Sequence, residues 1–155
     1  MTTPPPPATS THSGPTLGLL IRQLRDGIWE RMEHELALAG HPLTFSQYVT
    51  IKKLALCTKV SVTDLARAAE LNPGAMTRLL DKLEAKGLVT RVADPADRRA
   101  LHIHLTKAGL NIWRDIKQCG ERVLEFSLTG FSHDERDQLM HLLERVRRNL
   151  SPAGD

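Results

Sequence analysis

The stretch from Asn72 to Leu105 constrains the fold more than any other part of this 155-residue chain. Asn72 is a favoured N-cap residue and Pro73 suits the first helical position, so a helix is predicted to begin there. Its apolar residues recur at helical spacing and define a buried face, at Met76, Leu79, Leu80 and Leu83. The opposite face then carries Gly74, Thr77, Arg78, Asp81 and Lys82. Gly87 is predicted to end the helix, because glycine adopts the left-handed conformation at little cost.

A β-hairpin is predicted to follow this helix. Residues 88–93 are β-prone, and the segment from Asp94 to Arg99 is typical of a turn because it contains Pro95 and two aspartates. The residues after the turn alternate between leucine or isoleucine and histidine from 101 to 105, which is the period of a half-buried strand. A helix with a free polar face and a hairpin tipped with arginines together fit double-stranded DNA, the helix in the major groove and the tip in an adjacent groove.

The distribution of charge favours the same partner. Seven basic and four acidic residues lie between Asn72 and Lys107, a net charge of +3, which equals the net charge of the whole chain. The basic excess is therefore concentrated in the helix and hairpin, as expected of a nucleic-acid-binding segment.

These motifs closely resemble the winged helix–turn–helix core of the MarR (multiple antibiotic resistance regulator) family. The resemblance is carried by LA-x-x-A-x-L-N before the helix, T-R-L-L-D-K-L-E-x-K-G-L-V-x-R through its end, and D-P-x-D-R-R in the hairpin, which corresponds to the wing. Flanking helices extend it to about Leu17–Leu150. It implies a mainly α fold with a small β-wing, a homodimer, and sequence-specific binding to a pseudo-palindromic operator as a repressor. It also implies release by a small effector, which in this family is often phenolic or anionic.

The rest of the chain is consistent with one domain of this kind. Residues 1–15 are rich in proline, threonine and serine and are predicted to be a disordered tail. Residues 16–150 are expected to form the single domain, with 44–105 as the winged helix–turn–helix lobe and 16–40 and 106–150 as dimerisation helices. Capping patterns begin helices at Thr44, Ser61 and Ser132. Apolar stripes from Leu17 to Met32 and from Leu139 to Leu150 exceed what one small lobe can bury.

The DNA-contacting residues follow from the helix wheel and from the resemblance. We expect Thr77 and Arg78 to read bases, Lys82 and Lys107 to touch phosphate if they touch DNA at all, and an arginine of the wing tip to enter a minor groove. Lys82, Glu84 and Lys86 are expected to pair with one another. The family pattern indicates that Asp94 or Asp97 braces the wing arginine. The full predicted set is Ser61, Asn72, Pro73, Gly74, Ala75, Thr77, Arg78, Lys82, Asp97, Arg98 and Arg99.

An effector pocket is expected between the dimerisation helices and the DNA-binding lobe. This location comes from the resemblance, and the region would be lined by the first, second and fifth helices. The candidates are Trp29, His41, Tyr48, Lys52 and Trp113, each of which is equally compatible with a core or surface role.

The sequence gives little support for catalysis or metal binding. It has no glycine-rich phosphate loop and no nucleophile in a known context, so no catalytic residue, cofactor or metal is expected. His102 and His104 lie on the outward face of the second strand, where a solvent-facing or phosphate-contacting role is favoured over a shared metal.

Cys57 and Cys119 are too few for a disulfide framework, which indicates a reducing compartment. No apolar run approaches a membrane span, and residues 1–15 do not resemble a secretory signal, so we expect a cytoplasmic protein with no membrane contact. Both cysteines are interpreted as small core residues. Two alternatives stay open: a winged-helix module that binds another protein, and a regulator that senses oxidants through cysteine. Family members of the latter kind use a cysteine in the first helix, which has none here.

Overall fold

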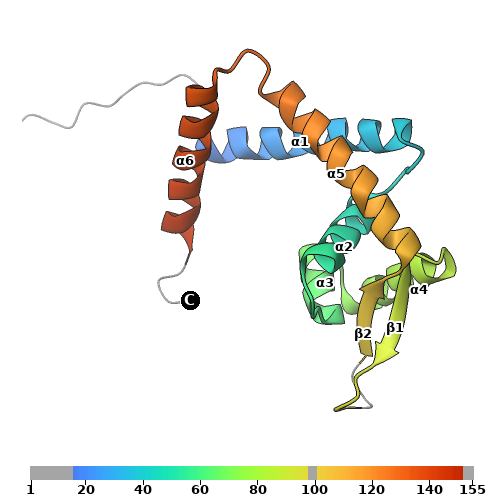
Figure 1. Cartoon of the computed structure of the whole chain (residues 1–155). Coiled ribbons are helices and arrows are strands. Elements are labelled where there is room, and N and C mark those ends of the chain that lie inside the picture. The colour runs from blue at the N-terminus through green and yellow to red at the C-terminus, as the bar shows by residue number, and fades with distance from the viewer. Residues whose placement is uncertain (1–15, 98–100, 152–155) are drawn as a thin grey trace, which may run out of the picture.

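The structure is a computed structural model that describes residues 16–97 and 101–151. Its elements in chain order are α1 (Leu17–Leu38), α2 (Phe45–Leu56), α3 (Val62–Ala68), α4 (Pro73–Ala85), β1 (Val89–Ala93), β2 (Leu101–Leu105), α5 (Lys107–Ser127) and α6 (His133–Leu150). Helices α2, α3 and α4 and the hairpin form one lobe, α1 and α5 cross above it, and α6 stands to one side (Figure 1). The mainly α architecture with a small β-wing is confirmed.

The helix boundaries follow the capping residues that the sequence contains. Thr44, Ser61 and Ser132 each begin a helix with a reciprocal capping box, and Thr16 and Thr106 accept a hydrogen bond from the first turns of α1 and α5. Gly87, the predicted end of its helix, has a positive φ angle, as do Gly40 and Gly130 after α1 and α5, all between 70° and 86°. Local sequence chemistry therefore accounts for most of the element boundaries.

Two apolar clusters hold α1 to α5 and the hairpin together. The first lies inside the lobe, where α4 contributes Met76, Leu80 and Leu83 against α3, β1 and β2. The second lies between α1, α2 and α5 and centres on Leu36, Ile51 and Ile116. Helix α2 contributes to both clusters, so it connects the lobe to the long helices above it.

The hairpin pairs β1 with β2 in antiparallel register, from Val89 opposite Leu105 to Ala93 opposite Leu101. Burial on its inner face is less complete than strict alternation predicts. Ile103 is buried, but Leu101 is 52% exposed. Its partner Ala93 is also exposed, so this end of the hairpin projects beyond the lobe core. The wing therefore leaves the body of the protein, as a groove-contacting element must.

No helix within residues 16–97 and 101–151 combines the length and apolarity needed to cross a bilayer.

Candidate nucleic-acid interface

Helix α4 presents the polar face that the sequence predicts. The Oδ1 atom of Asn72 accepts the Ala75 N–H at 2.8 Å, which caps the helix, and Pro73 and Gly74 at its start are exposed. Gly74, Thr77 and Arg78 are all exposed on the outer side. The Thr77 hydroxyl donates to the Pro73 carbonyl at 3.0 Å, so its Oγ1 can still accept a hydrogen bond from a partner.

The turn before α4 has a feature that sequence reasoning missed. Glu70 follows α3 with φ of +56°, a left-handed conformation that residues other than glycine adopt only at a cost of about 1 kcal/mol or more. The next residue, Leu71, donates its N–H to the Ala66 carbonyl at 2.9 Å, which closes the end of α3. This turn sets the direction in which α4 leaves α3. Glycine is the usual signal for such a position, and it is absent here.

Ser61, a predicted DNA contact, caps α3. Its hydroxyl accepts the Asp64 N–H at 3.1 Å and donates to the Asp64 carboxylate at 2.7 Å. The Ser61 hydroxyl and the Ser61 backbone N–H both donate to the Asp64 carboxylate, which lowers the pKa of Asp64 below its usual value because these bonds stabilise the ionised form. Ser61 therefore has a structural role in the helix–turn–helix.

The expected pairing among Lys82, Glu84 and Lys86 is wrong. Glu84 pairs instead with Arg91 of β1, and the other arm of the same guanidinium holds Asp81 at 2.7 Å. Residues two apart on a helix do not face one another, whereas the strand that follows brings Arg91 back alongside α4. Within the described residues Arg78, Lys82 and Lys86 form no ion pair, so their charges are available to an anionic partner.

The wing turn is held by Asp94. One carboxylate oxygen accepts the Ala96 N–H at 2.8 Å, and the other lies 2.7 Å from Nε2 of His102 on β2. The Ala96 N–H and His102 lower the pKa of Asp94, in that order of effect. His102 was expected to face solvent or phosphate, and the structure corrects this: its ring is partly buried against Asp94, which sequence spacing alone did not reveal.

The remaining wing predictions divide between described and undescribed residues. Asp97 is exposed, whereas Arg98 and Arg99 lie outside the described residues. The predicted bracing of a wing arginine by Asp94 or Asp97 therefore stays a prediction. His102 and His104 have ring centroids 6.3 Å apart. Within the described ranges no group of three or more His, Cys, Asp or Glu side chains is placed to hold a metal ion.

The five candidate effector residues are only partly brought together. Trp29 of α1 lies 5.4 Å from the Tyr48 ring, and the Lys52 ammonium lies 5.7 Å from the same ring. Trp113 of α5 packs, like Trp29 and Tyr48, against the apolar cluster between α1, α2 and α5. His41 instead bonds Asp115 of α5 through Nε2 at 2.7 Å, which ties the α1–α2 connection to α5. An aromatic group with a nearby cation therefore exists at the predicted junction.

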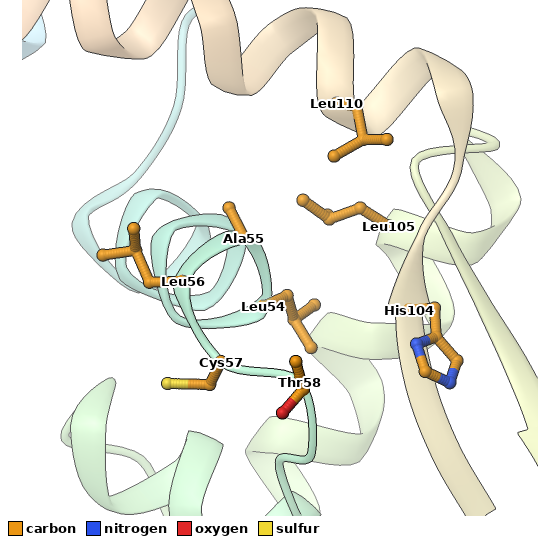
Figure 2. Close-up of a pocket in the computed structure, with 8 residues that line it drawn as sticks. All are labelled: Leu54, Ala55, Leu56, Cys57, Thr58, His104, Leu105 and Leu110. Atoms are coloured by element: carbon orange, nitrogen blue, oxygen red, sulfur yellow. The ribbon is translucent and has the colours of Figure 1, made fainter.

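A hollow of about 410 Å³ lies elsewhere, where the end of α2 meets β2 and the first turn of α5 (Figure 2). Leu105 of β2 and Leu110 of α5 lie together at one end, and Thr58 and His104 lie toward the other. Its lining is Leu54, Ala55, Leu56, Cys57, Thr58, His104, Leu105 and Leu110. It contains none of the five predicted effector residues. Its walls come from the ends of three elements, and no sequence periodicity marks such a place.

A charged cluster between α1 and α5 was also missed. Glu35 is only 7% exposed, yet it binds Arg122 at 2.7 Å and Arg31 at 2.9 Å. The hydrogen bond from Arg122 is the largest cause of the lowered pKa of Glu35. Cys119 lies beside it with no exposed surface, and burial raises the pKa of its thiol. These groups link the two long helices, α1 and α5.

Comparison with known proteins agrees with this geometry. The MarR family model matches residues 43–101, which span the lobe from the start of α2 to the start of β2. The chain is 36% identical over 113 residues to the HTH-type transcriptional regulator SarZ of Staphylococcus haemolyticus, covering 72% of this chain and 75% of that protein. It is 30% identical to the transcriptional regulator HosA of Escherichia coli over 126 residues, covering 81% of this chain and 90% of the relative.

Solved structures give the same result for the fold. The apo form of wild-type MarR from E. coli superposes with a TM-score of 0.75 at 25% identity, covering 86% of this chain and 98% of the other. A MarR family protein from Bacillus stearothermophilus superposes with a TM-score of 0.76 at 25% identity, covering 88% and 94% of the two chains. With the capped helix–turn–helix, the projecting hairpin and these relatives together, the chain belongs to the MarR family of winged helix–turn–helix, DNA-binding transcriptional regulators.

Proposed function

We propose that this regulator is a homodimeric repressor that binds a pseudo-palindromic operator through α4 and the wing. The observation that carries the proposal is the outer face of α4, where Arg78 and Thr77 are exposed while Met76 and Leu80 anchor the opposite face in the core. A helix held in this way can enter a major groove without losing its packing. Phosphate contacts from Lys82 would orient it.

The dimer is supported by apolar surface that one chain leaves uncovered. The first half of α1 exposes Leu17, Leu20, Ile21, Leu24 and Ile28, and α6 exposes Met140, Leu142, Leu143 and Leu150. None of the residues of α6 is buried. Contiguous exposed apolar faces of this kind mark association sites. A second copy that covers both faces also supplies the second recognition helix that a palindromic site requires.

Effector release is the less direct part of the proposal. Two recognition helices must lie about one helical repeat apart, roughly 34 Å, to occupy successive major grooves. A small phenolic or anionic ligand that binds better at another spacing lowers DNA affinity by its difference in affinity for the two states. The aromatic group around Trp29 and Tyr48 and the hollow beneath Leu110 both lie where the lobe meets the long helices, so occupancy of either bears on that spacing.

Substitution of Arg78 tests the proposed DNA-reading face. The parent protein first selects a duplex from a random pool. Arg78→Ala should then weaken the free energy of binding to that duplex by about 1–3 kcal/mol and relax specificity at one base position in each half-site. Arg148→Ala removes the same charge from the exposed face of α6 and should leave affinity and specificity unchanged. Measuring affinity for every single-base variant of the selected duplex gives both quantities. A variant of Arg78 that binds as tightly and as selectively as the parent would show that another face reads the DNA.

A further inference from the structure

Arg91 differs from the other described basic residues of the helix and wing segment. Among Arg78, Lys82, Lys86, Arg91 and Lys107, it alone forms an ion pair within residues 16–97 and 101–151. Its Nη2 atom lies 2.7 Å from Asp81, and its Nη1 atom donates to Glu84. Both carboxylates lower the guanidinium's tendency to lose its proton, so the pKa of Arg91 is raised, with Asp81 as the largest cause. Both terminal nitrogens of the guanidinium are thus bonded to α4.

The two carboxylates are more exposed than the cation that neutralises them. The side chains of Asp81 and Glu84 are 59% and 41% exposed, whereas that of Arg91 is 22% exposed. Asp81 follows Arg78 by three residues and Thr77 by four, so it lies on the same outer stripe of α4, one turn along. A carboxylate in that position faces the phosphates whenever Arg78 faces the bases, and like charges at such range repel.

We propose that Arg91 is a positioning residue for DNA binding, which acts through Asp81 and Glu84 and does not touch DNA. Its planar fork holds both carboxylates against β1, neutralises them beside the phosphates, and joins the recognition helix to the wing. Arginine suits this role because its guanidinium can bond two carboxylates at once. The inference rests on the proposed binding face of α4 and adds to it the reason why an acidic residue is tolerated there.

A double-mutant cycle separates this role from a direct phosphate contact. Operator affinity is measured at several salt concentrations for the parent, Arg91→Gln, the double variant Asp81→Asn with Glu84→Gln, and the triple variant. Arg91→Gln should lose about five- to tenfold in affinity at low salt, and the loss should shrink as salt screens the exposed carboxylates. In the background that lacks both carboxylates, Arg91→Gln should cost less than about twofold, because nothing is left to neutralise.

Arg136→Gln is the matched control. The Arg136 side chain is 26% exposed and bonds the Glu125 carboxylate at 2.9 Å, so its loss removes a similarly covered arginine of α6 that pairs with one acidic residue instead of two. Far-ultraviolet circular dichroism and thermal unfolding establish that each variant is folded. If Arg91→Gln does not fold, the same cycle is run with Arg91→Lys, whose single ammonium should lose about twofold in the parent background and nothing in the other.

Three results would overturn the inference. Equal losses in the two backgrounds would mean that Arg91 contacts DNA directly. An undiminished affinity of Arg91→Gln would mean that the carboxylates do not oppose binding. A loss from Arg136→Gln equal to that from Arg91→Gln would mean that only net charge is sensed. A parent protein that selects no duplex from the pool contradicts the proposed function itself, which is a distinct outcome.

Discussion

Cys57 and Cys119 are the two thiols of this chain, and their surroundings differ. Cys119 is fully covered, lies 3.2 Å from Nη2 of Arg122, and donates to the Glu35 carbonyl at 3.6 Å. Burial raises the pKa of its thiol, so little of the reactive thiolate forms at neutral pH. Cys57 is partly exposed at the edge of the hollow beneath Leu110. The interpretation of Cys119 as a core residue is confirmed. Cys57 packs against the apolar cluster of the lobe but is only partly buried.

We expect a soluble disulfide reagent to modify Cys57 in the native protein well before Cys119. The reason is access, since Cys57 is partly exposed whereas Cys119 has no exposed surface. Stopped-flow absorbance with the parent, Cys57→Ser and Cys119→Ser measures this directly. Cys57→Ser should lose the fast phase, and Cys119→Ser should keep it. A fast phase that survives in Cys57→Ser would mean that the α1–α5 packing opens readily, and oxidant sensing by Cys119 would then regain support.

At the scale of elements, the junction between the wing lobe and α5 depends on one glycine. A Cβ atom added at Gly109 would lie 2.2 Å from the Leu88 carbonyl oxygen and 3.1 Å from the Leu105 side chain. Thr106 strengthens the junction by donating its hydroxyl to the Gly87 carbonyl at 2.5 Å and its N–H to Leu88 at 3.0 Å. The close approach lets α5 begin directly after the hairpin and in contact with it, which fixes the orientation of the lobe relative to α5.

Gly109→Ala should therefore destabilise the protein by about 1–3 kcal/mol, because a backbone atom must move to admit the methyl group. Gly120→Ala in the same helix is the matched control. A Cβ there meets nothing within 4 Å, so alanine's better helix propensity should leave stability unchanged or raise it by up to about 1 kcal/mol. Chemical denaturation followed by circular dichroism measures both. Similar midpoints for the two variants would contradict a tight contact at residue 109.

At the scale of the whole molecule, the exposed faces of α1 and α6 govern assembly. Leu143 lies within the apolar stripe of α6, and His141 lies on the opposite side of the same helix. Leu143→Asp should produce a monomer or an unfolded chain, because association would bury an unpaired charge. His141→Asp adds the same carboxylate on the polar side and should leave the dimer intact.

Light scattering and sedimentation across micromolar concentrations test this prediction. A parent protein that is a well-folded monomer throughout the range would refute the dimer. A Leu143→Asp variant that remains dimeric would instead exclude α6 from the interface, and would leave the face of α1 from Leu17 to Ile28 as the surface that associates.

The sequence by itself determined the features that depend on near neighbours. The caps at Asn72, Ser61 and Ser132, the glycine at the end of α4 and the buried face of that helix are all confirmed. Each depends on hydrogen bonds or side-chain spacing within one helix and its ends, so a local pattern is enough to reveal it. The family motifs lie in this same segment, which is why the fold and its DNA-binding class could be predicted together.

Only the tertiary structure decided which groups meet across elements. Arg91 pairs with Asp81 and Glu84, His102 pairs with Asp94, and Glu35 pairs with Arg122, which is 87 residues away in the sequence. The hollow at Leu105 and Leu110 and the contact over Gly109 likewise arise where separate elements touch. Periodicity records which face of an element is apolar but not which charged group lies opposite it. That pairing depends on how the elements cross, and the crossing is set by packing between residues far apart in the sequence.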